Sequence, residues 1–133
     1  MFIRACVKPT AALEREAHVG DGWLAMPKVV TNATAGGQTI TVEQMLGGIA
    51  MFTGAAGAVA YTYPTGALIA AAFPEMDIGD TYVFKVVNTA AQVATFTTAA
   101  SGTTLAGLVT ANANSRWVLM EKTAAAAFKL THF

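Results

Sequence analysis

The stretch PTGALIAAAFPEMDIGDTYVFKVVNT, residues 64–89, sets the structural pattern of this chain. Its first part places apolar residues at near-helical spacing between two prolines, and Thr65 stands where it can cap the first turn. Pro74 ends the run, because the residue before a proline disfavours the helical conformation. Residues 77–80 are typical of a turn, in which Gly79 is free to take a positive φ. We therefore predict a short helix followed by a tight turn.

A strand follows this turn, because the apolar period changes from helical spacing to two. Tyr82, Phe84 and Val86 fall on one face, and the residues between them fall on the other. Residues 88–91 are typical of a second turn, and residues 92–98 are again rich in β-branched and aromatic side chains. The pattern predicts a β-hairpin with the short helix laid against its entry.

The rest of the chain predicts further short strands separated by small-residue turns. Residues 43–46 are expected to form one helical turn, with Thr41 as its cap and Gly47-Gly48 as its end. Strands are expected at residues 38–42, 49–53, 58–63, 103–105, 108–111, 115–122 and 127–132. This number of short strands predicts a mainly β fold, an antiparallel β-sandwich or jelly-roll-like barrel with one or two short helices.

The N-terminal residues differ from the rest in composition. Residues 1–32 hold a large share of the charged side chains, and residues 11–18 have the pattern of one or two helical turns. We predict two parts, an extended N-terminal arm at 1–32 and a β-sandwich domain at 33–133. The alternative is that residues 1–32 form an ordinary N-terminal strand and loop. The arm's apolar side chains are the candidate contacts with a partner: Phe2, Ile3, Val7, Leu13, Trp23, Leu24 and Met26.

Composition indicates a surface that is shared with other molecules. The 133-residue chain has a formal net charge of zero, and only 12% of its residues are charged. That share is about half the usual one. Zero net charge gives no electrostatic reason to bind nucleic acid or an anionic membrane. A surface so poor in charge is typical of a protein covered by a partner, often by copies of itself.

One uncharged segment has to be weighed as a membrane span. Residues 44–74 carry no charged side chain, but glycines and a proline interrupt them and hydroxyl-bearing residues dilute them. A spanning helix requires about 20 mainly apolar residues in an unbroken run. We therefore expect neutral strands and turns here, and no membrane partner.

No residue pattern indicates an enzyme, a cofactor or a metal. Glu14 and His18 share a helical face at i, i+4 spacing, but a metal needs three or four ligands and no second cluster accompanies them. The acidic residues at 75–80 lack the ligand spacing of a calcium loop. Cys6 has no neighbouring base to activate its thiol, and it has no disulfide partner in this chain. We predict a non-enzymatic protein without cofactor.

Alternating aromatic residues leave two readings open. The set is Tyr61, Tyr63, Tyr82, Phe84 and Phe96. Such a pattern is typical of a sandwich core, but exposed aromatic rings also form platforms on which sugars stack. Burial of these rings would favour the core.

The order of several short motifs resembles a family of viral proteins. The resemblance covers at most residues 41–133, so the arm lies outside it. The module it resembles is found in virion proteins of tailed bacteriophages, namely capsid decoration (cement) proteins and head or tail fibre domains. The motifs are Q-x-L-G-G at 44–48, a small-residue helix between prolines at 64–74, I-G-D at 78–80, V-x-N-T at 86–89 and T-L-x-G at 104–107.

This resemblance implies a structural role. The protein would be made in the host cytoplasm and would sit on the outside of the phage head. There it would bind the major capsid protein, stabilise the capsid lattice, and associate with itself as a homodimer or homotrimer. The alternative that the resemblance allows is a head or tail fibre (adhesin) module that binds host-surface glycan.

Overall fold

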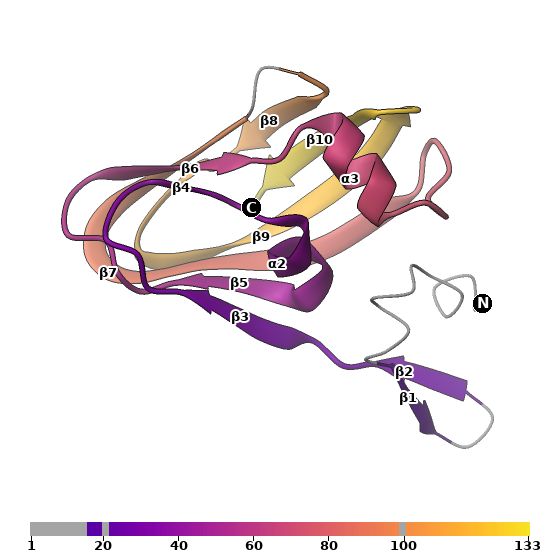
Figure 1. Ribbon diagram of the computed structural model, residues 1–133, viewed down its shortest axis with the longest axis horizontal. Helices are drawn as coiled ribbons and strands as arrows, with labels where there is room; N and C mark the ends of the chain where they lie inside the picture. Colours follow the sequence, from indigo (N-terminus) through magenta and orange to yellow (C-terminus); the bar gives the residue numbers. More distant parts are fainter. Residues whose placement is uncertain (1–15, 20–21, 99–100) are drawn as a thin grey trace.

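The computed structural model describes residues 16–19, 22–98 and 101–133, with side chains from Met26 onward. Among these residues the fold is mainly β with two short helices, as predicted (Figure 1). The elements in chain order are β1 (Glu16–Val19), β2 (Gly22–Ala25), β3 (Lys28–Asn32), β4 (Gln38–Thr39), α2 (Val42–Gly47), β5 (Gly48–Phe52), β6 (Val59–Tyr63), α3 (Gly66–Ala72), β7 (Thr81–Thr98), β8 (Thr103–Gly107), β9 (Thr110–Ala124) and β10 (Ala127–His132).

A single large sheet folds back on itself and gives the sandwich-like or barrel-like shape. Its strand order is β3-β5-β7-β9-β10-β8, and β6 joins β7 and β4 off this path. The first half of β7 pairs with β5, and the second half pairs with β6. Because one strand serves both layers, β5 and β6 lie on opposite sides of the core, and β7 turns between them (Figure 1).

Strand directions are mixed, whereas the sequence predicted antiparallel pairing. β9 runs antiparallel to β7 and β10, but β3, β5 and β7 are parallel neighbours, and so are β6 and β7. Parallel neighbours need a crossover connection between them. α2 lies in the connection from β3 to β5, and α3 lies in the connection from β6 to β7. The short helices therefore allow the parallel pairs.

The hairpin predicted at 81–98 is wrong, because these residues form the single strand β7. Its ladder with β9 shifts register between Asn88 and Val93. Residues 88–91, which the sequence predicted as a turn, therefore form an irregularity inside the strand. Asn88 is fully buried there; its Nδ2 donates to the carbonyls of Gln92 (2.7 Å) and Ala111 (3.0 Å). The Ala90 N–H donates to its Oδ1. The side chain thus replaces the ladder bonds that the bend interrupts.

The facing strand is also longer than predicted. β9 is continuous over Thr110–Ala124, so the turn expected at 112–114 lies inside it. Ala113 has a φ of 47°, the left-handed region that a non-glycine residue seldom adopts. The distortion faces the irregular part of β7, so the two strands bend together.

The helix ends and the tight turn are confirmed. Thr41 and Gln44 form a reciprocal capping box at the start of α2, and Gly48 ends that helix with a φ of 93°. Thr65 caps α3, accepting from the Leu68 N–H. Gly79 has a φ of 95° in the turn that leads into β7.

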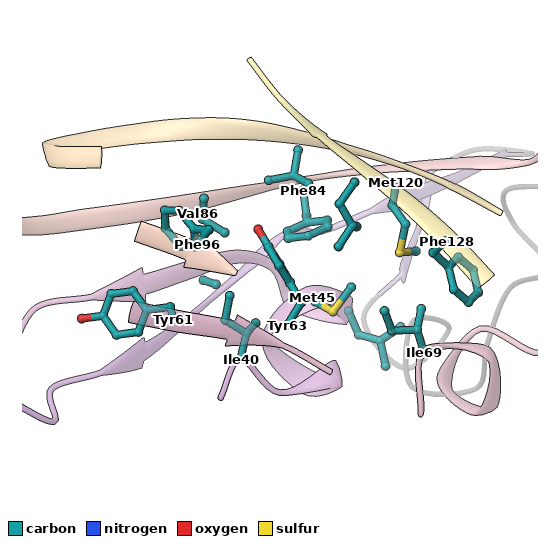
Figure 2. Packing of buried hydrophobic residues seen from close by; sticks show 14 of the residues in the cluster. Ile40, Met45, Tyr61, Tyr63, Ile69, Phe84, Val86, Phe96, Met120 and Phe128 are labelled. Atoms are coloured by element: carbon teal, nitrogen blue, oxygen red, sulfur yellow. The ribbon is translucent and has the colours of Figure 1, made fainter. Parts of the chain in front are cut away.

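The core fills the space between the two layers (Figure 2). Phe52 and Tyr61 stack with ring centroids 4.0 Å apart, which ties the β5 layer to the β6 layer. The two helices add apolar side chains at the end of the molecule away from the bend of β7 (Figure 1). The largest fully buried side chains are Tyr61, Tyr63, Phe52, Phe73, Phe84, Phe96, Phe128, Ile40, Met45, Ile69, Met120 and Leu130.

Two segments that the sequence assigned to the arm have regular structure. Glu16–Val19, expected to belong to a helical turn, instead forms β1 and pairs with β2 as a separate two-stranded sheet. β3, which was placed at the end of the arm, pairs in parallel with β5 and so belongs to the main sheet. Within the described ranges, no helix is long and apolar enough to cross a membrane.

Candidate binding face on the sheet

The outward side of the sheet carries an apolar surface, which we call the outer face. Strand register brings Val29, Ile49, Lys85 and Trp117 side by side across β3, β5, β7 and β9. Phe133 extends this row, since its backbone N–H and carbonyl both bond to those of Trp117. The outer face comprises Val29, Ile49, Met51, Val83, Lys85, Val87, Trp117, Leu119 and Phe133.

Several of its side chains are about half exposed to solvent. The exposed fractions are 47% for Val29 and Val83, 46% for Trp117 and 57% for Phe133. A sheet face that meets water is usually polar, with the apolar residues on the side of the core. Here much of the outward side is apolar as well, with Thr81, Glu121, Lys129 and Thr131 on its polar part. The apolar part has the composition of a contact surface.

One cation lies within this face and is held against an aromatic ring. The Lys85 Nζ is 5.1 Å from the centre of the Trp117 ring. A lysine over a tryptophan face is attracted by the ring's electron density, and this attraction holds the two side chains together. The outer face therefore carries one positive charge beside its tryptophan.

Local sequence explains why these residues point outward. In β7 the alternation buries Phe84 and Val86 and leaves Val83 and Lys85 outside. In β9 the same alternation buries Val118 and turns Trp117 outward. The alternation in each strand therefore separates the two faces. It did not reveal that four neighbouring strands would bring them together, because that depends on the strand order.

The predicted contact residues are only partly described by the structure. Phe2, Ile3, Val7 and Leu13 lie outside the described residues. Trp23 and Leu24 belong to β2, where only the backbone is described. Met26 is half exposed and lies just before β3, the strand at the border of the outer face. The assignment of these seven residues to a partner contact remains a prediction.

The candidate metal positions form no site within the described part of the chain. No group of three or more His, Cys, Asp or Glu residues is close enough there to hold an ion. Glu14 lies outside the described residues, and the backbone of His18 is in β1. In the acidic segment, Asp80 Oδ2 accepts from the Asp77 N–H at 2.8 Å, so this carboxylate closes the turn.

Most of the alternating aromatic residues are buried, as the core interpretation predicted. Tyr61, Tyr63, Phe84 and Phe96 are at most 1% exposed, which removes them as a platform for sugar. Tyr82 is half-buried, and its hydroxyl donates to the carbonyls of Met45 and Leu46 at the end of α2. Among the described side chains, the exposed aromatic rings are those of Trp117 and Phe133 on the outer face.

A buried histidine lies on the core side of the same sheet. His132 is 1% exposed, and its Nε2 is 2.8 Å from the Tyr63 hydroxyl. Burial lowers the pKa of His132 from 6.5 to about 4; the Ala106 backbone opposes this change and the charge of Arg116 adds to it. At neutral pH the ring is therefore uncharged. It packs against Phe96 as part of the core.

No family model, curated protein or solved structure matches the chain in comparisons of its sequence and fold. The residues and their arrangement therefore carry the functional argument. They define a mainly β domain with a buried aromatic core and an apolar outer face.

Proposed function

We propose that the protein is a non-enzymatic structural component of a tailed-phage virion. It binds the outside of the head, contacts the major capsid protein, and stabilises the capsid lattice. It is made in the host cytoplasm and associates with copies of itself. The observation that carries this proposal is the outer face, an apolar surface across β3, β5, β7 and β9 of a chain that has no net charge.

The physical properties of this face suit repeated lattice contacts. An apolar surface of this kind gives modest affinity for each copy, because only part of the buried area appears as binding free energy. Many copies attached to one shell turn modest contacts into stable attachment. The low charge prevents repulsion between neighbouring copies on the lattice.

The motifs behind the phage resemblance fit this division of roles. Gln44 and Gly48 set the two ends of α2, and Gly79 sets the turn before β7. Asn88 holds the bend of β7, and Gly107 has a φ of 82° at the end of β8. These motif residues support the fold. The contact surface lies on other residues, which is where lattice proteins of one fold would differ from each other.

Co-sedimentation with capsid shells tests the proposal. Shells assembled from the major capsid protein of the phage that encodes this chain are mixed with the wild-type protein or with Val83→Thr/Trp117→Thr. We expect wild type to sediment with the shells and the double variant to stay in solution. Ile78→Thr is the control, because Ile78 is 68% exposed but lies off the outer face. Equal binding by all three proteins would contradict the proposal.

Trp117 favours a second candidate, the glycan-binding fibre or adhesin module. A half-exposed tryptophan beside a lysine is a surface on which a sugar ring stacks. A glycan array separates the two functions. Binding to a defined glycan that Trp117→Thr abolishes would support the adhesin, and no binding would support the capsid role.

A further inference from the structure

β3 is an edge of the main sheet in the described part of the chain. One side of β3 pairs in parallel with β5, and no strand within 16–19, 22–98 and 101–133 pairs with its other side. The Asn32 carbonyl accepts from the Thr53 N–H on the β5 side. In a parallel pair, alternate residues direct both backbone groups to the same neighbour. Val30 therefore also points toward β5, and Val29 and Thr31 direct their backbone groups outward.

The middle of this edge lacks the usual protection. Natural sheets protect their edges with lysine, proline, bulges or very short strands. Pro27 and Lys28 stand at the start of β3, but Val29, Val30 and Thr31 are all β-branched and favour pairing. The exposed edge therefore matches another strand of the same kind.

We propose that β3 of one copy pairs antiparallel with β3 of a second copy, with a twofold axis at Val30. Val29 of each copy then lies opposite Thr31 of the other, and these residues exchange backbone hydrogen bonds. The two Val30 residues form the non-hydrogen-bonded pair at the centre. The contact is isologous, so it closes as a dimer. This inference rests on the self-association part of the proposed function and selects the dimer over the trimer.

Charge placement agrees with this register. Lys28 is the only charged residue of β3 and stands at one end of it. Antiparallel pairing about Val30 places Lys28 opposite Asn32 of the other copy. The two lysines are then about 13 Å apart along the strands, at about 3.3 Å for each residue. The register therefore avoids repulsion.

Side-chain direction also agrees with this pairing. Val29 belongs to the outer face and lies beside Ile49, while Val30 points to the inner side. Joining the two β3 strands therefore joins the two outer faces edge to edge. The dimer presents one apolar surface, twice as wide, to a capsid lattice.

A charge-swap experiment on the full chain tests both the pairing and its register. One variant carries Val29→Lys and Thr31→Lys, and the other carries Val29→Glu and Thr31→Glu. In the proposed register each variant opposes like charges in its own dimer, which weakens the dimer by about tenfold. An equal mixture opposes lysine to glutamate and should restore the dimer. The readout is sedimentation equilibrium, with wild type expected at twice the 13.7 kDa chain mass.

Thr31→Pro provides an independent test that does not rely on charge. Its missing N–H points away from β5, so the monomer keeps its own ladder while the dimer loses donors. Thr31→Val is the matched control, since it keeps the N–H and the β-branched shape. We expect Thr31→Pro to be monomeric with an unchanged far-UV circular dichroism spectrum, and Thr31→Val to be dimeric.

Three results would overturn the inference: a monomeric or trimeric wild type, a dimer that survives Thr31→Pro, or charge variants that do not recover on mixing. Each is distinguishable from failure of the proposed function. A protein that dimerises as described but ignores capsid shells would refute the capsid role alone. A monomer that binds shells through Trp117 would refute the dimer alone.

Discussion

The Tyr63 hydroxyl lies 2.8 Å from Nε2 of His132, and this pair links β6 to β10 inside the core. Both side chains are almost fully buried, so the contact is protected from water. It places a titratable group where the charged form is costly.

Stability should fall as the pH is lowered from about 6.5 to about 4. In the unfolded chain His132 binds a proton near pH 6.5, whereas burial lowers its pKa in the folded chain to about 4. Between these values the unfolded state binds more protons, so the free energy of unfolding decreases with decreasing pH, by up to about 3 kcal/mol. Urea unfolding across this range measures the decrease.

The substitution His132→Gln separates the contribution of His132 to the pH dependence of stability from that of the Asp and Glu side chains. Gln can still bond to the Tyr63 hydroxyl, but it does not titrate. The difference in free energy of unfolding between wild type and His132→Gln should therefore change with pH across this window. A constant difference would refute the assignment.

Asn88→Ala should destabilise the protein by about 2–4 kcal/mol, because it leaves the buried carbonyl of Ala111 and the part-buried carbonyl of Gln92 without their donor. Urea unfolding gives the magnitude. The exposed Asn112 is the matched control, and Asn112→Ala should change stability by less than about 0.5 kcal/mol. Equal effects of the two substitutions would show that Asn88 does not hold the bend.

Gly66→Ala should cost about 3 kcal/mol, because the new Cβ would overlap the Ala126 carbonyl oxygen, a backbone atom that cannot easily move. The Gly66 N–H also donates to the Ser101 carbonyl. The start of α3 therefore lies against the segments around Ser101 and Ala126. Thermal unfolding measures the loss. Gly57→Ala is the control, since nothing lies within 4 Å of its Cβ position. An unchanged melting temperature for Gly66→Ala would contradict this close packing.

Deleting residues 1–25 should leave the β domain folded, whereas deleting residues 1–32 should destabilise it. The longer deletion removes β3 and exposes the edge of β5. Far-UV circular dichroism and urea unfolding distinguish the two products. If the arm contacts the capsid, the shorter deletion also loses co-sedimentation with shells. Undiminished binding would refute the predicted contacts in the arm.

Local features of the fold were predictable from the sequence, because they depend on neighbouring residues. The caps at Thr41 and Thr65, the turn around Gly79 and the alternation of faces along the strands follow from short spacings. The bend of β7 was not predictable in this way. Asn88 and its neighbours have the composition of a turn, and only pairing with β9 and β6 keeps them within a strand.

The outer face was not predictable from the sequence for the same reason, because it depends on pairing between strands that are distant in the chain. The alternation in β7 and β9 separates Val83 from Phe84 and Trp117 from Val118, but no local pattern says which face is buried or which strands will be neighbours. Parallel pairing of β3 and β5 through α2 brought Val29 beside Ile49. Residues of the arm were the more obvious apolar candidates in the sequence, because they stood apart from the regular alternation.

The shared strand β7 also determines how the molecule can come apart. Its two halves belong to the two layers, and β9 accompanies it through the bend. Loss of the ladder in one layer would release the strand that anchors the other. Hydrogen exchange in β5 and β6 is therefore expected to report a single opening event, shared by both layers, in place of separate fluctuations.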